Sequence, residues 1–257
     1  MSPDLRPRVV LLGASNVTLA LRPIVEIARG VRDEPLEILA AHGHGRSYGT
    51  WSRAFFVRDL PGIDACGLWN ALDARRAPET FALVTDVGND LVYGRRVDEI
   101  LAWVARDVER LLAIGAHVAV TRLPLSSLRT LTPWRFRIVQ SLLFPGRRLE
   151  LAALLDRARE LDERLVELMA TRGIVMFQPR IEWYGRDPIH VRASLRKSAF
   201  AEVLSRWDPL RAEKALTARD WRALRSSKPE LRRLFGRTQT RAQPCVRFED
   251  GSTFAQY

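Results

Sequence analysis

Five short runs along the chain are apolar almost throughout and stop at a turn residue or a polar cluster. Runs of this length and character are typical of parallel strands that are buried on both faces of a sheet. They span residues 9–12, 36–41, 81–87, 117–121 and 173–177. The pattern therefore predicts a five-stranded parallel sheet.

Between these runs the apolar residues recur at intervals of three and four, which is the spacing of a helix with one buried face. The predicted helices cover residues 17–28, 52–59, 97–114, 150–171 and 194–207. Strands that alternate with helices need crossover connections, and these cover both faces of a parallel sheet. We therefore predict a three-layer α/β/α sandwich of the flavodoxin-like type.

The sequence changes character after residue 207. Residues 208–257 carry 11 basic and 6 acidic residues and begin with helix-like spacing over 210–234. They end in two short runs around Asp250-Gly251, a pair that favours a tight hairpin turn. We predict a main domain over 1–207. A small basic appendage over 208–257, helical at first and ending in a β-hairpin, packs on that domain.

The composition is that of an ordinary globular protein. Apolar residues make up 47% of the 257 positions. No apolar run approaches the roughly 18 residues that cross a bilayer. The first residues hold no signal-type apolar stretch, and two cysteines are too few for a disulfide framework. We therefore expect a cytoplasmic protein.

The formal net charge of +11 raises the question of a nucleic-acid or membrane partner. All but three of the 41 basic residues are arginine, and they are spread along the chain, mostly at positions typical of outer helix faces. Basic charge alone supports only non-specific binding, so we expect no specific nucleic-acid partner. A peripheral contact with an anionic membrane stays open.

Three polar motifs follow the first, third and fifth apolar runs. Because the carboxyl ends of parallel strands meet at one edge of a sheet, we expect these motifs to lie together. A serine, an asparagine and an Asp-x-x-His pair, in this order, supply a nucleophile, an oxyanion donor, an orienting carboxylate and a base. The motifs are Gly13-Ala14-Ser15-Asn16, Val87-Gly88-Asn89-Asp90 and Asp187-Pro188-Ile189-His190.

Each motif alone also has an ordinary structural interpretation. A serine between a strand and a helix is a common N-cap, and Asn89-Asp90 after a strand is usual turn chemistry. Asp90 is also well placed to anchor its own loop by hydrogen bonds. Asp187-Pro188 equally suits a surface turn. Only the ordered set favours a hydrolytic site.

Residues 42–49 follow the second run and contain three glycines, which indicates special backbone geometry or a close approach. Their spacing is one residue longer than the dinucleotide-binding fingerprint, and they follow the second strand rather than the first. His42 and His44 have the spacing of a metal site, but no cluster of cysteine, histidine or carboxylate residues accompanies them. We therefore expect neither a metal nor an organic cofactor.

Taken together, the motifs resemble those of the SGNH hydrolases, also called the GDSL esterase/lipase family. The resemblance covers residues 8–207 and implies an SGNH-like hydrolase domain over 1–207. It implies that Ser15 is the nucleophile, His190 the general base and Asp187 the partner that orients the base.

The same resemblance implies an oxyanion hole made by the N–H groups of Ser15 and Gly45 and by the Asn89 side chain. Gly45 is preferred over Gly43 because Gly45-Arg46-Ser47 is similar to a Gly-Arg-Ser found in some esterases of the family. The implied chemistry is acyl transfer through an acyl-enzyme.

This chain departs from the family pattern at two places. The usual Gly-Asp-Ser-Leu is Gly13-Ala14-Ser15-Asn16 here, and Val87 replaces the first glycine of Gly-x-Asn-Asp. The missing aspartate is not a triad member. The triad chemistry is therefore retained in principle, while the hydrogen bonds of the serine loop must differ.

Side chains close in sequence to the predicted site are candidates for the substrate pocket and are equally compatible with ordinary core. They are Asn16, Arg46, Tyr48, Asp90, Tyr93 and Trp183, with Trp51 and Tyr184 as further aromatic candidates. Residues 125–144 interleave apolar side chains with arginines. This pattern fits a lid or interfacial helix, or a helix packed on the domain, which we favour.

The leading hypothesis is a serine hydrolase that cleaves a carboxylic ester of a small-molecule or lipid-like substrate. An acyltransferase that uses the same acyl-enzyme is the alternative within this chemistry. A non-catalytic SGNH-like binding protein is the alternative from another class. The four retained groups Ser15, Asn89, Asp187 and His190 favour an enzyme.

Overall fold

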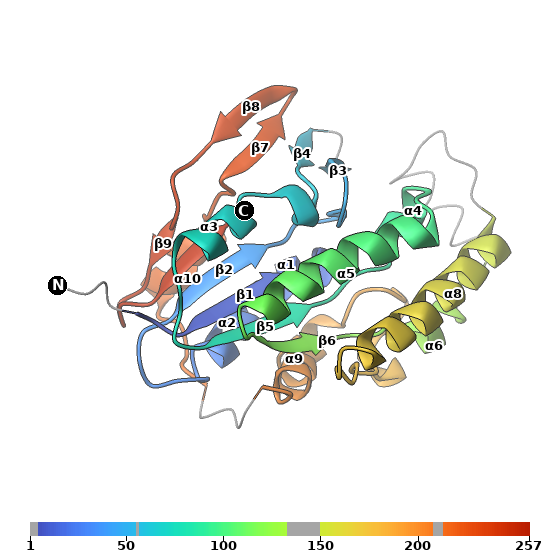
Figure 1. Cartoon of the computed structure of the whole chain (residues 1–257), viewed down its shortest axis with the longest axis horizontal. Coiled ribbons are helices and arrows are strands. Elements are labelled where there is room, and N and C mark those ends of the chain that lie inside the picture. The colour runs from blue at the N-terminus through green and yellow to red at the C-terminus, as the bar shows by residue number, and fades with distance from the viewer. Residues whose placement is uncertain (1–4, 55–56, 133–149, 208–212) are drawn as a thin grey trace.

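A computed structural model describes residues 5–54, 57–132, 150–207 and 213–257 of the chain (Figure 1). Its central sheet consists of β1 (Arg8–Leu12), β2 (Glu37–Ala41), β5 (Thr80–Val84), β6 (His117–Val120), β9 (Val246–Arg247) and β10 (Thr253–Gln256). The spatial order is β6-β5-β1-β2-β10-β9. The neighbours from β6 to β10 are parallel, and β9 is antiparallel to β10.

Helices cover both faces of this sheet, which makes the three predicted layers (Figure 1). One face is covered by α3 (Leu68–Ala74), α5 (Val97–Ala113) and α8 (Leu151–Ala170). The other is covered by α2 (Leu21–Ala28), α9 (Arg196–Leu204) and α10 (Ala218–Arg225). The predicted α/β/α sandwich is therefore confirmed.

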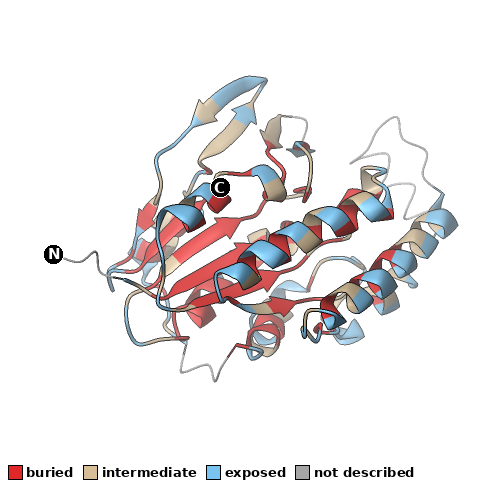
Figure 2. Cartoon of the chain, viewed as in Figure 1, coloured by how far each residue is buried: buried red, intermediate tan, exposed pale blue. Residues whose placement is uncertain are grey.

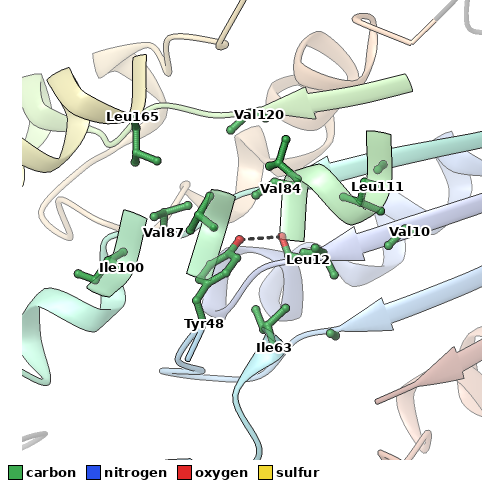
Figure 3. Close-up of a cluster of buried hydrophobic side chains, with 14 of the residues drawn as sticks. Val10, Leu12, Tyr48, Ile63, Val84, Val87, Ile100, Leu111, Val120 and Leu165 are labelled. Atoms are coloured by element: carbon green, nitrogen blue, oxygen red, sulfur yellow. Dashed lines mark hydrogen bonds between the residues drawn. The ribbon is translucent and has the colours of Figure 1, made fainter. Parts of the chain in front are cut away.

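The central strand β1 is apolar at consecutive positions because both of its faces are buried. Val10 and Leu12 belong to the core under α5, and Val9 and Leu11 belong to the core under α2. All four side chains have 0% exposure, and Figure 2 shows the buried strands between the two helical layers. Figure 3 shows the first of these cores, in which Tyr48 packs among aliphatic side chains.

The sheet has six strands rather than the predicted five. Residues 173–177 form no strand, and only an isolated bridge joins Phe177 to Thr121. The fifth parallel strand is instead β10, which pairs with β2 through Phe254 and Ile38. β10 lies about 215 residues after β2 in the chain, so no local pattern reveals that pairing.

A second sheet is built from β3 (Ser52–Ala54), β4 (Arg58–Leu60), β7 (Leu231–Leu234) and β8 (Arg237–Thr240), all antiparallel and in that order. The helix predicted over 52–59 is therefore wrong. β3 pairs with β4, and β4 pairs in turn with β7, which lies near the far end of the sequence. This tertiary pairing has overridden a weak local preference for helix.

The C-terminal residues contribute to both sheets. β7 and β8 extend the second sheet, and β9 and β10 extend the central one. The hairpin predicted around Asp250-Gly251 is confirmed, with Gly251 at the positive φ of 84° that its turn requires. Of the helix-like stretch 210–234, the described part holds α10 and then β7. The division of the chain at residue 207 stays a prediction.

The remaining elements are short. They are α1 (Ser15–Leu19), α4 (Asn89–Val92), α6 (Leu125–Leu128), η1 (Ile63–Ala65), η2 (Ile181–Trp183) and η3 (Ala193–Leu195). Leu125 and Leu128 pack against the core, as expected for a helix on the domain. The rest of segment 125–144, from residue 133 onward, lies outside the described residues.

The strand order places a topological switch at β1, because β2 and β5 lie on opposite sides of it. In an open parallel sheet, ligands bind beyond the carboxyl ends of the strands at such a point. The loops after β1, β2 and β5 therefore converge on one region. Within the described parts of the chain, no helix has the length and apolar character that a membrane span requires.

One carboxyl group of the described fold is buried without hydrogen bonds that would offset the free-energy cost of its burial. Asp107 on α5 has 0% exposure, and neither of its oxygens has a hydrogen-bond partner among the described residues. Burial, reinforced by the nearby charge of Asp64, raises the pKa of Asp107 well above its usual value. The folded state therefore keeps this carboxyl protonated at pH values where the unfolded chain ionises it.

We predict that Asp107→Asn is more stable than the wild type at neutral pH, by about 1–3 kcal/mol. The contribution of Asp107 to the stability of the wild type should fall as pH rises above about 4, because only the unfolded chain then releases the proton. The advantage of Asp107→Asn therefore grows with pH. Thermal unfolding at pH 5, 7 and 9 measures it.

The matched control is Asp162→Asn, since Asp162 is equally buried but accepts hydrogen bonds from Arg122 and from the Leu123 amide. That variant should be less stable than the wild type. A lower melting temperature of Asp107→Asn at every pH would contradict the assignment.

Candidate active site

The candidate nucleophile Ser15 lies at the first position of α1, directly after the end of β1. The turn is tight: a Cβ on Gly13 would come within 2.5 Å of Val17 Cγ2 and 2.8 Å of Thr85 Cγ2. Only glycine fits there without moving a neighbour. As the first residue of α1, Ser15 has no intrahelical acceptor for its N–H.

A chain of hydrogen bonds joins three of the predicted site residues. His190 Nε2 lies 2.8 Å from Ser15 Oγ. His190 Nδ1 lies 2.6 Å from Asp187 Oδ2. The structure therefore brings together residues that are 175 positions apart, with the histidine between the hydroxyl and the carboxylate.

Asp187 is held in its orientation by its own loop. Its Oδ1 accepts hydrogen bonds from the backbone N–H groups of Ile189 at 3.1 Å and His190 at 3.2 Å. Burial favours a higher pKa for the Asp187 carboxyl, but the hydrogen bonds and charge of His190 and the two amides outweigh it and lower the pKa below its usual value. The group therefore stays a carboxylate at neutral pH.

Asn89 lies at the start of α4, after β5. Its Nδ2 is buried and has no hydrogen-bond partner among the described residues. A buried amide donor without an acceptor costs free energy unless a ligand supplies the acceptor. The unsatisfied Nδ2 of Asn89 is therefore suited to donate a hydrogen bond to a substrate oxygen.

Gly45 lies in a turn closed by a hydrogen bond from Arg46 N to Gly43 O at 3.1 Å. Its φ is 64°, a left-handed conformation that glycine adopts without strain. Tyr93 Oη donates to Gly45 O at 2.6 Å. Tyr93, predicted to bind substrate, thus contacts the loop of the candidate oxyanion glycine.

Arg46, Tyr48 and Asp90 were expected to bind substrate, but the structure makes them internal supports. Each has 0% exposure. Arg46 donates to Pro61 O at 3.0 Å, and Tyr48 Oη donates to Thr85 O at 2.7 Å. A fully buried side chain with protein partners is not available to a ligand outside the protein.

Asp90 anchors the loop after β2, whereas its position beside Asn89 had suggested that it anchors its own loop. It accepts hydrogen bonds from Ser47 Oγ and, at 2.8 Å, from Tyr48 N. Burial nevertheless raises the pKa of the Asp90 carboxyl above its usual value. The loop that carries Gly45 is thereby tied to the helix that carries Asn89.

Trp183 is also a core residue rather than part of a substrate pocket. It is 7% exposed and stacks on Phe177, with ring centroids 5.6 Å apart and planes at 7°. Trp51 is exposed and lies under Arg233, whose guanidinium carbon is 4.2 Å from the ring centroid. Tyr184 is half-buried, and burial raises the pKa of its hydroxyl.

The two histidines of the glycine-rich loop have different surroundings. His42 is buried and its Nδ1 lies 2.9 Å from Thr18 Oγ1, and burial lowers its pKa to about 3. Burial also lowers the pKa of His44, with the charges of Arg58 and His190 contributing. Among the described residues, no group of three or more possible metal ligands is found.

Asp86 is the important site residue that sequence reasoning missed. It follows β5 and has the positive φ of 62°, which is uncommon for a residue with a side chain. Its Oδ2 accepts from Ala14 N at 2.8 Å and from Asn16 N at 3.0 Å. The one available signal was its place just before the Val87-Gly88-Asn89-Asp90 motif.

Asn16 was predicted to contact substrate, but its side chain binds the protein. Nδ2 donates to Asp86 Oδ1 and to Ile189 O, both at 2.8 Å. Oδ1 accepts from Val191 N at 3.0 Å. Both amide hydrogens are therefore used within the chain.

Comparison with known proteins is informative at the level of the fold. No protein-family model matches the sequence, and no curated protein matches it. The inhibitor-bound M. smegmatis aryl esterase has a TM-score of 0.51 and 15% identity, over 79% of this chain and 100% of that chain. For the native form of the same enzyme the TM-score is 0.50 and the identity is 14%, over 79% of this chain and 100% of that chain. The fold is therefore that of this esterase.

We predict that Gly45→Ala costs more stability than Gly173→Ala, which serves as its control. Both glycines have positive φ, 64° and 70°, so each substitution carries a backbone penalty of about 1–2 kcal/mol. A Cβ at Gly45 also lies 2.9 Å from Tyr93 Oη, whereas a Cβ at Gly173 meets nothing within 4 Å. Equal losses in urea unfolding would contradict this reading of the loop.

Proposed function

We propose that this protein is a serine hydrolase that cleaves a carboxylic ester through a Ser15–His190–Asp187 triad. The observation that carries the proposal is the continuous pair of hydrogen bonds, 2.8 Å from His190 Nε2 to Ser15 Oγ and 2.6 Å from His190 Nδ1 to Asp187 Oδ2. The fold shared with an aryl esterase supports the same chemistry.

In the first step, Ser15 Oγ attacks the ester carbonyl carbon while His190 Nε2 takes the hydroxyl proton. The Asp187 carboxylate, which accepts from Nδ1, holds the ring in the tautomer with Nε2 free and stabilises the imidazolium that forms. His190 then gives the proton to the departing alcohol, leaving an acyl-Ser15 ester.

The tetrahedral intermediate carries a negative charge on the former carbonyl oxygen. The N–H groups of Ser15 and Gly45 and the Asn89 amide are the proposed donors to that oxygen. The buried Nδ2 of Asn89 has no hydrogen-bond partner among the described residues, which supports this role, because a bond to the oxyanion can form there when the charge develops.

In the second step, His190 takes a proton from water as the water oxygen attacks the acyl carbon. The same donors hold the second oxyanion, and His190 returns the proton to Ser15 as the acid leaves. Every proton in the cycle passes through one nitrogen, His190 Nε2, and no cofactor enters it.

The first experiment is hydrolysis of p-nitrophenyl esters from acetyl to long-chain by the wild type and Ser15→Ala. We expect hydrolysis and fluorophosphonate labelling by the wild type, and neither by the variant. A serine at another edge of the fold, Ser252→Ala, is the matched control and should remain active. A folded wild type that neither hydrolyses an ester nor takes the label contradicts the proposal.

We predict that Asn89→Ala folds normally but has a kcat lower by ~10²–10³. The loss arises because one donor to the oxyanion is removed while the nucleophile and base remain. Steady-state kinetics with p-nitrophenyl acetate measures it, and circular dichroism checks the fold. A rate within twofold of the wild type removes Asn89 from the oxyanion hole.

A further inference from the structure

The turn that carries Ser15 is held from outside by a single carboxylate oxygen. Asp86 Oδ2 accepts the backbone N–H groups on both sides of Ser15, those of Ala14 at 2.8 Å and Asn16 at 3.0 Å. The N–H of Ser15 itself is not among the bonds to Asp86. The carboxylate thus occupies the two flanking donors and leaves the middle one for another acceptor.

The other oxygen of Asp86 binds the Asn16 side chain, which connects this turn to the histidine loop. Asp86 Oδ1 accepts from Asn16 Nδ2 at 2.8 Å. The same Nδ2 donates to Ile189 O at 2.8 Å, and Asn16 Oδ1 accepts from Val191 N at 3.0 Å. Asn16 therefore grips the residues immediately before and after His190.

We propose that Asp86 and Asn16 are positioning residues that set the distance between Ser15 and His190. This inference deepens the proposed function and rests on it. Three hydrogen bonds join Asp86 to the turn of Ser15, and two more join Asn16 to the histidine loop, all between 2.8 and 3.0 Å. A shift of either loop breaks several of them at once.

The pair also accounts for the departure of this chain from Gly-Asp-Ser-Leu. The position before Ser15 is Ala14, with no side-chain acceptor, and the position after it is Asn16 rather than an apolar residue. The carboxylate that organises the turn comes instead from Asp86 on the neighbouring loop. The two unusual positions are thus linked, because the Asn16 side chain donates a hydrogen bond to Oδ1 of Asp86, the oxygen that does not bind the backbone of the turn.

The backbone of Asp86 is itself adapted to this role. Its φ of 62° is left-handed, and aspartate and asparagine tolerate that conformation better than other residues with a side chain. Asp86→Asn therefore preserves the shape and the backbone while it removes the charge. The new amide has only one oxygen. If that oxygen accepts the two backbone N–H groups, the amide NH₂ faces Asn16 Nδ2, which requires an acceptor. In the other orientation the two backbone N–H groups lose their acceptor.

The experiment compares Asp86→Asn, Asn16→Asp and the double variant Asp86→Asn/Asn16→Asp with the wild type on p-nitrophenyl acetate. We expect each single variant to lower kcat by ~10² with KM within about threefold, because misplaced groups slow the chemical step more than binding. In the double variant the bond is restored in the opposite direction, because an amide at 86 donates to a carboxylate at 16. Its kcat should exceed the product of the single effects by at least about tenfold.

The control is Asp250→Asn. Asp250 also accepts a backbone N–H, from Ser252 at 2.9 Å, and pairs with an arginine, but it precedes β10 at the opposite edge of the sheet. It should keep the wild-type kcat. Single effects that simply multiply in the double variant, or an Asp86→Asn kcat within twofold of the wild type, overturn the proposal.

A readout independent of turnover separates this inference from the proposed function. The low-field proton resonance of His190 Nδ1–H, identified by its loss in His190→Gln, reports the bond to Asp187. We expect it to shift or broaden in Asn16→Asp and Asp86→Asn and to stay in Asp250→Asn. If the wild type hydrolyses no ester, the proposed function fails. An unchanged resonance in both variants overturns the positioning role alone.

Discussion

The candidate site depends on the fact that β1 is buried on both faces and paired on both edges. Its side chains are fully enclosed, and its backbone bonds to β2 and β5 in register. The pairing continues past the strand end, where Gly13 N donates to Ala41 O at 3.1 Å and Thr85 N donates to Leu12 O at 2.9 Å. The turn that carries Ser15 therefore begins at a backbone position that hydrogen bonds to both neighbouring strands hold in place.

Carboxylates at the end of β5 join the loops around that point. Asp86 binds the turn after β1, and Asp90 binds the loop after β2. Both come from the segment that also carries Asn89. One stretch of chain thus relates the candidate nucleophile, the candidate oxyanion glycine and the candidate oxyanion asparagine to each other, because a carboxylate accepts several hydrogen bonds at once.

The C-terminal strands support the same region from behind. Tyr257 N donates to Ala40 O at 2.9 Å beside the end of β2, and Arg46 donates to Tyr257 O. Arg46 is one residue beyond Gly45 and has no exposed surface. The loop that holds Gly45 is therefore backed by residues that the sequence pattern assigned to a peripheral appendage.

Much of the architecture was accessible from periodicity. The four runs that form β1, β2, β5 and β6 are long enough and apolar enough to indicate buried strands. The helices predicted over 97–114 and 150–171 have clear apolar stripes. The pattern was wrong at 52–59 and 173–177. The first segment takes its structure from β7. The second forms only an isolated bridge to Thr121 beside β6, and the fifth parallel strand, β10, lies beside β2 on the other side of the sheet. In sequence, β7 is far from β4 and β10 is far from β2.

The sequence by itself determined the class of fold and the chemical identity of the candidate site, because burial periodicity is local and the order of Ser15, Asn89, Asp187 and His190 is read directly from the chain. Tertiary structure alone decided which polar residues support the site from within. Arg46, Tyr48, Asp90 and Asn16 were candidate substrate ligands in sequence. The first three are supports because they are fully buried, and Asn16 is one because its amide binds Asp86 and Ile189. Asp86 gave almost no signal, because its role arises from two N–H groups 70 or more positions away that only folding brings to it.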